Sequence, residues 1–247
     1  MNGMNRWLLL FCLTGWWGGA LQAAEGLKLP QTRVIFNAGD KSTTAGIQNL
    51  SHIPYLVKAE VRNINEQGVQ QLVPFRVIPP LFRLEPQSQY TVRILPISDV
   101  KLPLDRESVF YLSFLAIPSS PRSSKSGMDT AISAKVSVGL QTLIKMFYRP
   151  STLSMGAREA EGKLLFHTVL DTVVMENPTP YYLTLNTLTI KGQDIDLTKS
   201  GAMIAPFSVK AYSVLGKKNK AIYTVINDYG ALSRPYSREI SSLKEKP

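Results

Sequence analysis

The stretch ISAKVSVGLQTLIKMFYRP at positions 132–150 decides how the rest of the chain is interpreted. Apolar side chains recur at its even positions and polar or small ones at most odd positions, which is the period of a β-strand. At roughly 3.4 Å per residue it would be about 60 Å long, about three times an ordinary strand. Such a row is either the centre of a sheet or an edge where another chain can pair, and the alternation alone leaves both open. The even positions are Ile132, Ala134, Val136, Val138, Leu140, Thr142, Ile144, Met146 and Tyr148.

The first 23 residues have the composition of a secretory signal peptide. Arg6 supplies a positive start, an apolar run fills 7–17, and small residues lead up to Ala23 and Ala24. We predict cleavage after Ala23, with Ala24 as the second choice. No later stretch approaches the roughly 18 apolar residues that a membrane span needs, so the mature chain is expected to be soluble and exported.

The composition of the 247 residues, 44% apolar, allows one large or two ordinary domains with cores of their own. The only cysteine, Cys12, lies in the predicted signal, so the mature fold is expected to depend on its core without a disulfide. The formal net charge of +10 falls by one when Arg6 leaves with the signal. This balance suggests either an acidic partner or lysines spread over sheet surfaces. The predicted export and the lack of a long basic run argue against nucleic acid as the acidic partner.

Short alternating segments separated by turn residues predict an all-β protein of antiparallel, immunoglobulin-like sandwiches. A rigid turn is expected at 52–54, where Pro54 could follow a cis bond. The serine- and proline-rich segment 118–130 predicts a loop longer than a usual hairpin connection. The expected strands are 33–36, 43–49, 55–64, 75–78, 90–95 and 108–118, then 163–170, 172–175, 181–190, 208–214 and 221–225.

Three segments follow from these patterns. The predicted signal occupies 1–23, an N-terminal domain with the long strand occupies 24–150, and a C-terminal domain occupies 151–247. The polar and basic tail 241–247 is expected to fray.

Catalytic machinery is hard to assemble from this sequence. His52 and His167 fall in separate predicted domains, and no metal-ligand spacing, glycine-rich phosphate loop or nucleophile elbow is present. We therefore predict that the chain is not an enzyme and uses no metal or cofactor. A carbohydrate-binding module is not favoured either, because all three tryptophans lie in the predicted signal.

Six segments of the chain resemble, in the same order, segments of the periplasmic chaperones of the chaperone–usher pilus pathway, the PapD-like family. The resemblance covers nearly all of the mature chain. It implies a boomerang of two immunoglobulin-like domains whose cleft holds a pilus or fimbrial subunit. The implied chaperone works in the periplasm without ATP and delivers the subunit to an outer-membrane usher. The segments are IPYLVKAEV at 53–61, PPLFRLEP at 79–86, DRESVFYLSFLAIP at 105–118, LQTLIKMFYRP at 140–150, NPTPYYLTL at 177–185 and INDYG at 226–230.

Members of that family lend a long strand to complete the sandwich of their subunit, which is a form of β-augmentation. The resemblance places the lent row on Val136, Val138 and Leu140, with Ile132 and Ala134 extending it. It places the anchor for the subunit's C-terminal carboxylate on Arg33 and Lys145. We expect alanine at either cation to leave the folded domain nearly unaffected, because two close cations do not stabilise each other. The implied interdomain ion pairs involve Glu107, Arg149 and Asp228.

A fimbrial structural subunit or adhesin built of two sandwiches is the alternative function. Such subunits normally carry an alternating N-terminal extension and a disulfide, and neither is found at 24–31, AEGLKLPQ. An unloaded chaperone could also cover its apolar row by self-association, and the sequence leaves the oligomeric state open.

Overall fold

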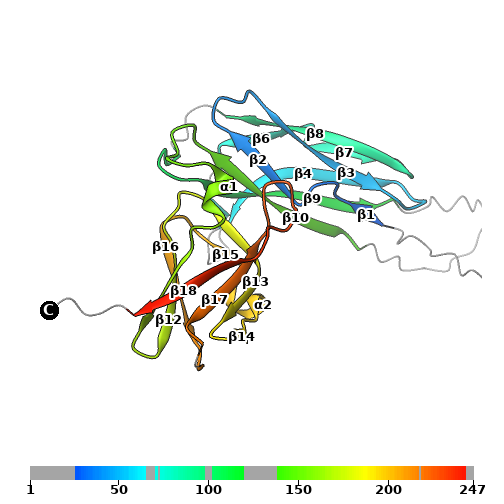
Figure 1. Cartoon of the computed structure of the whole chain (residues 1–247). Helices are drawn as coiled ribbons and strands as arrows, with labels where there is room; N and C mark the ends of the chain where they lie inside the picture. Colours follow the sequence, from blue (N-terminus) through cyan, green and yellow to red (C-terminus); the bar gives the residue numbers. More distant parts are fainter. Residues whose placement is uncertain are drawn as a thin grey trace, which may run out of the picture.

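The computed structural model describes residues 26–64, 70–71, 73–97, 102–119, 138–216 and 218–242. Within them the chain forms two β lobes that meet at an angle near the end of β10, Leu140–Arg149 (Figure 1). The predicted signal, most of the predicted loop 118–130, and the row positions Ile132, Ala134 and Val136 lie outside the described residues.

The N-terminal lobe is a sandwich of two sheets. One sheet has the order β1-β3-β8-β6, and the other has the order β2-β10-β9-β4-β5 with β7 also paired to β4. Alternate side chains of both sheets meet in one apolar core, in which Phe36, Phe110 and Phe114 are fully buried. The strands besides β10 are β1 Leu27–Lys28, β2 Arg33–Asn37, β3 Thr43–Asn49, β4 Tyr55–Ile64, β5 Gln70–Gln71, β6 Phe75–Ile78, β7 Leu81–Leu84, β8 Ser88–Pro96 and β9 Ser108–Pro118.

The C-terminal lobe is one curled sheet with the order β14-β13-β17-β18-β11-β12-β16, and β15 pairs with β13. A second apolar core fills it, centred on Tyr223 and Met175, and it is separate from the first. The elements are α1 Ala157–Ala160, β11 Leu165–Val169, β12 Thr172–Asn177, β13 Leu183–Ile190, β14 Gln193–Asp194, α2 Leu197–Ser200, β15 Met203–Ile204, β16 Ser208–Ser213, β17 Lys220–Val225 and β18 Tyr236–Ser242. The predicted boundary at 150 falls between the two cores.

The predicted all-β class with two immunoglobulin-like lobes is confirmed, and the strands at 43–49, 55–64, 75–78 and 108–118 have the predicted bounds. Most strand pairs are antiparallel as expected, and two are parallel. β2 runs parallel to β10, and β11 runs parallel to β18. Both pairs join strands far apart in the sequence, which leaves enough chain for the long crossover that parallel pairing needs. No tight hairpin therefore fixes their direction.

Three local predictions also need correction. The cis peptide bond in the described chain is at Ile78-Pro79 rather than before Pro54. The predicted frayed tail begins too early, because β18 continues to Ser242. Val138 and Gly139 precede β10 instead of lying within it, so the described part of the long strand begins at Leu140.

The alternation of the opening stretch also fails at one position. Met146 and Phe147 are consecutive in β10, yet both are buried. Met146 faces the first core, while the Phe147 ring lies 5.8 Å, centre to centre, from the ring of Tyr182 in the C-terminal lobe. The strand is thus covered on both faces where the lobes meet, a contact that a period of two cannot reveal.

Candidate functional site

Two cations lie side by side at the junction of the lobes. β2 and β10 pair in a register that sets Arg33 directly beside Lys145. Both side chains are half-buried, and burial lowers the pKa of each. The charge of Arg33 lowers the pKa of Lys145 further. Neither cation forms an ion pair with any acid in the described parts of the chain. The carboxylates of Asp228 and Glu107 act on Arg33 from beyond ion-pair distance and offset part of the effect of burial on its pKa.

Each cation also contacts the C-terminal lobe. The Nη1 atom of Arg33 donates a 2.8 Å hydrogen bond to the carbonyl oxygen of Ile226, and the Lys145 Nζ atom donates to the Thr184 hydroxyl at 3.4 Å. The guanidinium of Arg33 lies 6.0 Å from the centre of the Phe147 ring. Both cations therefore bridge the two lobes, and the expectation that alanine at either one leaves the folded domain nearly unaffected stays a prediction.

A second group of charges at the same junction is balanced. Arg149 binds Asp228 through two hydrogen bonds of 2.8 and 3.0 Å, and its Nε atom donates to Glu107 at 2.8 Å. Glu107, only 3% exposed, also accepts a 2.9 Å hydrogen bond from the backbone N–H of Tyr182. The structure thus brings together the three residues predicted as an interdomain ion-pair network. Asp228 belongs to the loop that follows β17, and Glu107 and Arg149 belong to the N-terminal lobe.

The pKa values follow from this arrangement. Burial raises the pKa of Glu107, against the opposing pull of Arg149 and of the Tyr182 N–H. Burial alone would lower the pKa of Arg149, but the hydrogen bond to Asp228 and the two carboxylate charges raise it above its ordinary value. Arg149 therefore stays charged under all ordinary conditions, and it is matched by two acids.

The apolar row ends beside these charges. Val138 and Leu140 are 74% and 53% exposed. Over 140–144, β10 pairs with β9 alone within the described residues, because β2 joins its other edge only from Lys145 onward. This part of β10 thus presents a sheet edge with exposed apolar side chains, and the cation pair marks where that edge closes.

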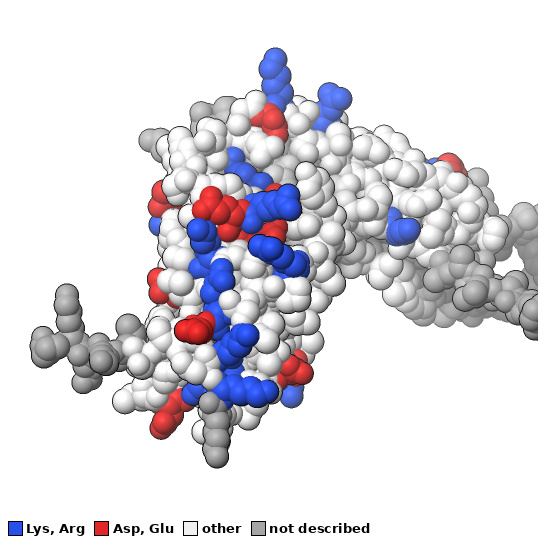
Figure 2. All heavy atoms as spheres, in the orientation of Figure 1, with Lys and Arg blue, Asp and Glu red and all other residues white. Residues whose placement is uncertain are grey.

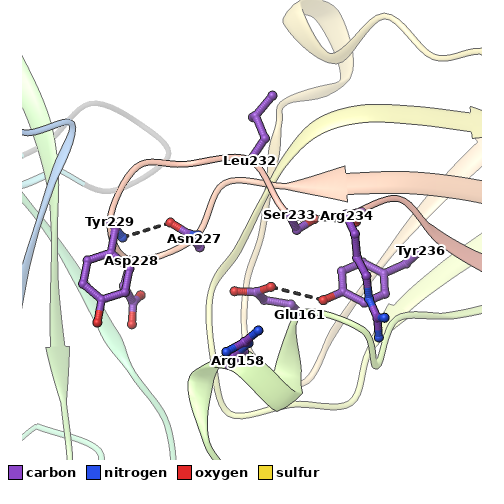
Figure 3. Close-up of a pocket in the computed structure, with 9 residues that line it drawn as sticks. All are labelled: Arg158, Glu161, Asn227, Asp228, Tyr229, Leu232, Ser233, Arg234 and Tyr236. Carbon is purple, nitrogen blue, oxygen red and sulfur yellow. Dashed lines mark hydrogen bonds between the residues drawn. The ribbon is translucent and has the colours of Figure 1, made fainter.

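A polar cavity of about 520 Å³ opens in the C-terminal lobe next to the balanced network. Figure 3 shows it between α1 and the loop after β17, with Asp228 and Tyr229 at one end and the Glu161 carboxylate hydrogen-bonded to the Tyr236 hydroxyl at the other. On the face that Figure 2 shows, Lys and Arg side chains gather over the C-terminal lobe, with acidic groups among them.

Neither a metal site nor a membrane-spanning helix is found in the part of the chain that is described. No group of three or more His, Cys, Asp or Glu side chains there is placed to hold a metal ion. No helix within those residues is long and apolar enough to cross a membrane.

Sequence reasoning missed the C-terminal residues that reach the cation pair. Thr184 and Ile226 contact Lys145 and Arg33 from positions that are distant in the chain. Both lie within segments that carry the family resemblance, but no local pattern indicates that a threonine hydroxyl and a backbone carbonyl would meet two cations of another lobe.

Comparisons with known proteins find relatives of both lobes. Residues 26–154 match the family model for the pili and flagellar-assembly chaperone PapD N-terminal domain, and residues 159–237 match that for the pili assembly chaperone PapD C-terminal domain. The probable fimbrial chaperone protein ElfD of Escherichia coli K12 is 33% identical over 227 residues, covering 91% of this chain and 89% of ElfD.

Two solved structures extend the comparison. The E. coli chaperone DraB has a TM-score of 0.72 at 31% identity, covering 87% of this chain and 97% of DraB. A chain in the complex of the Salmonella enterica SafA pilin with the SafB chaperone also has a TM-score of 0.72, at 27% identity, covering 88% of this chain and 98% of that one. These relatives are chaperones, which favours that function over a fimbrial structural subunit or adhesin.

Proposed function

Because the chain belongs to the PapD family of pilus assembly chaperones, we propose that it binds and stabilises pilus or fimbrial subunits by strand lending. The proposal includes work in the periplasm, after removal of the predicted signal 1–23, and delivery of the subunit to an outer-membrane usher. The family supports chaperone work rather than catalysis. The pilin bound to the SafB chaperone in the Salmonella complex supports a subunit of the same kind as partner.

The observation that carries the proposal is the outer edge of β10 at 140–144. It has no strand partner within the described chain, and it ends at two cations that form no ion pair there. Backbone N–H and C=O groups along such an edge can pair with the strand of almost any partner. The exposed side chains of Val138 and Leu140, and by the sequence pattern those of Ile132, Ala134 and Val136, then enter the apolar groove of the subunit.

Arg33 and Lys145 supply the anchor. Every subunit ends in a carboxylate, so a site that binds this group fixes the pairing register without reading side chains. A slip of one residue would turn the whole apolar row away from the groove. A carboxylate between the two cations would relieve their repulsion and would accept charge-assisted hydrogen bonds.

The experiment compares Leu140→Asp with Gln141→Asp, two adjacent positions of β10 that are both exposed. Subunit captured by affinity-tagged chaperone from periplasm is identified and quantified by mass spectrometry. Leu140→Asp should lower capture at least tenfold, because burying a charge in an apolar groove costs about 2 kcal/mol or more. Gln141→Asp, whose side chain points to the other face, should lower it much less.

Thermal unfolding of the free variants separates binding from folding. Leu140 is more than half exposed, at 53%, so Leu140→Asp should melt close to the wild type. Gln141→Asp gives up the 2.8 Å hydrogen bond from the Gln141 side-chain amide to the Ser113 hydroxyl and should melt slightly lower. Equal capture by Leu140→Asp and wild type would refute strand lending. Loss of folding along with capture would show that the row is core.

A further inference from the structure

Four residues close a ring of contacts across the junction of the lobes. Arg33 and Lys145 are neighbours in the register of β2 and β10. Lys145 donates to the Thr184 hydroxyl, and Thr184 accepts a second hydrogen bond, at its carbonyl oxygen, from the N–H of Ile226 at 2.8 Å. The carbonyl oxygen of Ile226 accepts from Arg33 and completes the ring.

The C-terminal half of this ring is held firmly. Thr184 is 5% exposed and pairs with Met203 of β15 through β13. Its β-branched side chain restricts rotation about χ1, so the hydroxyl has few alternative positions. A buried, rotationally restricted acceptor can therefore direct a long and flexible lysine side chain.

The N-terminal half of the ring keeps donors to spare. A lysine ammonium has three donors and a guanidinium has five, and the ring uses one from each. The Arg33 Nε atom is buried, and it has no hydrogen-bond partner among the described residues. The 3.4 Å bond from Lys145 to Thr184 is longer than the usual 2.9–3.0 Å. It therefore orients the ammonium without preventing it from turning toward an anion.

We propose that Thr184 is a positioning residue that holds the Lys145 ammonium beside Arg33, so that both lobes take part in capturing the terminal carboxylate of a subunit. This inference rests on the proposed function of Arg33 and Lys145. It adds that carboxylate affinity depends on a hydroxyl of the C-terminal lobe.

The test uses Thr184→Val, which removes the hydroxyl at nearly constant shape, and Thr184→Ser, which retains it. The probe is a synthetic peptide of alternating apolar and polar residues, ten residues long like β10, made with a free C-terminal carboxylate and as its amide. Calorimetry gives both affinities for each full-length variant. Wild type should prefer the acid, and Thr184→Val should reduce that preference about three- to tenfold, the range of one hydrogen bond. Thr184→Ser retains the hydroxyl but not the β-branch, so it should restore most of that preference.

A second measurement needs no peptide. Nuclear magnetic resonance of labelled lysine side chains should show the pKa of Lys145 shifted further down in Thr184→Val and unchanged in Thr184→Ser, because the hydroxyl stabilises the charged ammonium. Equal weakening of acid and amide binding, or an unchanged Lys145 pKa in a folded Thr184→Val protein, would refute the positioning role. A wild type that binds acid and amide equally would instead refute the carboxylate anchor.

Discussion

The junction of the two lobes carries two groups of charges that differ in their balance. Arg149 is matched by Glu107 and Asp228 within hydrogen-bond distance, whereas Arg33 and Lys145 face each other with no acid in ion-pair contact in the described chain. Both groups bridge the lobes. A buried charge that is paired needs no ligand, while a half-buried pair of like charges lowers its free energy when an anion arrives. We therefore propose a structural role for the first group and a binding role for the second.

Removing the cation from the balanced group should give the largest effect. Arg149→Ala leaves Glu107 buried without its partner, and breaking a buried ion pair costs about 3–5 kcal/mol. Urea unfolding at neutral pH should show this loss. Arg83→Ala removes a cation from the exposed pair with Glu85 and is the matched control, which should leave stability unchanged.

The pH dependence of the same variant tests the cause. Burial raises the folded-state pKa of Glu107 above its unfolded value, so its contribution to stability is fully present at low pH and is lost as pH rises through the folded pKa. The deficit of Arg149→Ala relative to wild type should therefore shrink as pH falls, because the buried Glu107 carboxyl, left unpaired, then binds a proton. A deficit that does not change with pH would mean that lost packing on Tyr181, 5.0 Å away, accounts for it.

The loop after β17 serves both groups, because it carries the carbonyl of Ile226 and the carboxylate of Asp228. Gly230 in this loop has a φ of 80°, and a Cβ there would lie 2.5 Å from the hydroxyl of Thr32. Gly230→Ala should therefore displace the loop and cost roughly 1–3 kcal/mol. Gly156→Ala, where a Cβ meets nothing within 4 Å, is the control.

Capture and stability should fall together in Gly230→Ala if both groups depend on this loop. Reduced stability of Gly230→Ala with full capture of subunit would show that capture does not depend on this loop as stability does. It would then show that the bond from Arg33 to Ile226 is not needed for the anchor.

Local pattern predicted the strands best where one face is buried and turn residues bracket the segment. β3, β4, β6 and β9 have their predicted bounds for this reason. β18 was missed because Ile240 is its one fully buried apolar residue, so pairing with β17 and β11 holds it rather than an apolar row. The burial of Phe147 was missed because its cover comes from Tyr182 in the other lobe.

The candidate site was less accessible from pattern alone. Alternation says nothing about the parallel register that sets Arg33 beside Lys145, and the family resemblance supplied both residues. It could not supply Thr184 or Ile226, because a hydrogen bond between lobes depends on how they dock. The same holds for the hydrogen bonds by which the two cations bridge the lobes.

Removing a charge from the pair Arg33 and Lys145 should have the smallest effect on stability. Unlike Arg149→Ala, such a change breaks no ion pair in the described chain. Burial and Arg33 lower the folded-state pKa of Lys145, so its neutral form contributes stability that is present above its unfolded pKa of about 10.4 and is lost as pH falls through the folded pKa. At neutral pH the charge of Lys145 therefore opposes folding.

Lys145→Met keeps much of the side-chain volume, removes that charge and gives up the long bond to Thr184. The two changes oppose each other, so the free energy of unfolding should stay within about 1 kcal/mol of wild type. Capture of subunit should nevertheless fall strongly, while Lys199→Met, at a side chain that is 86% exposed, should change neither property. For wild type, affinity for a carboxylate should fall at alkaline pH, beginning below the ordinary lysine pKa as Lys145 loses its proton. A clear loss of stability in Lys145→Met, with capture retained, would place Lys145 with the structural charges instead.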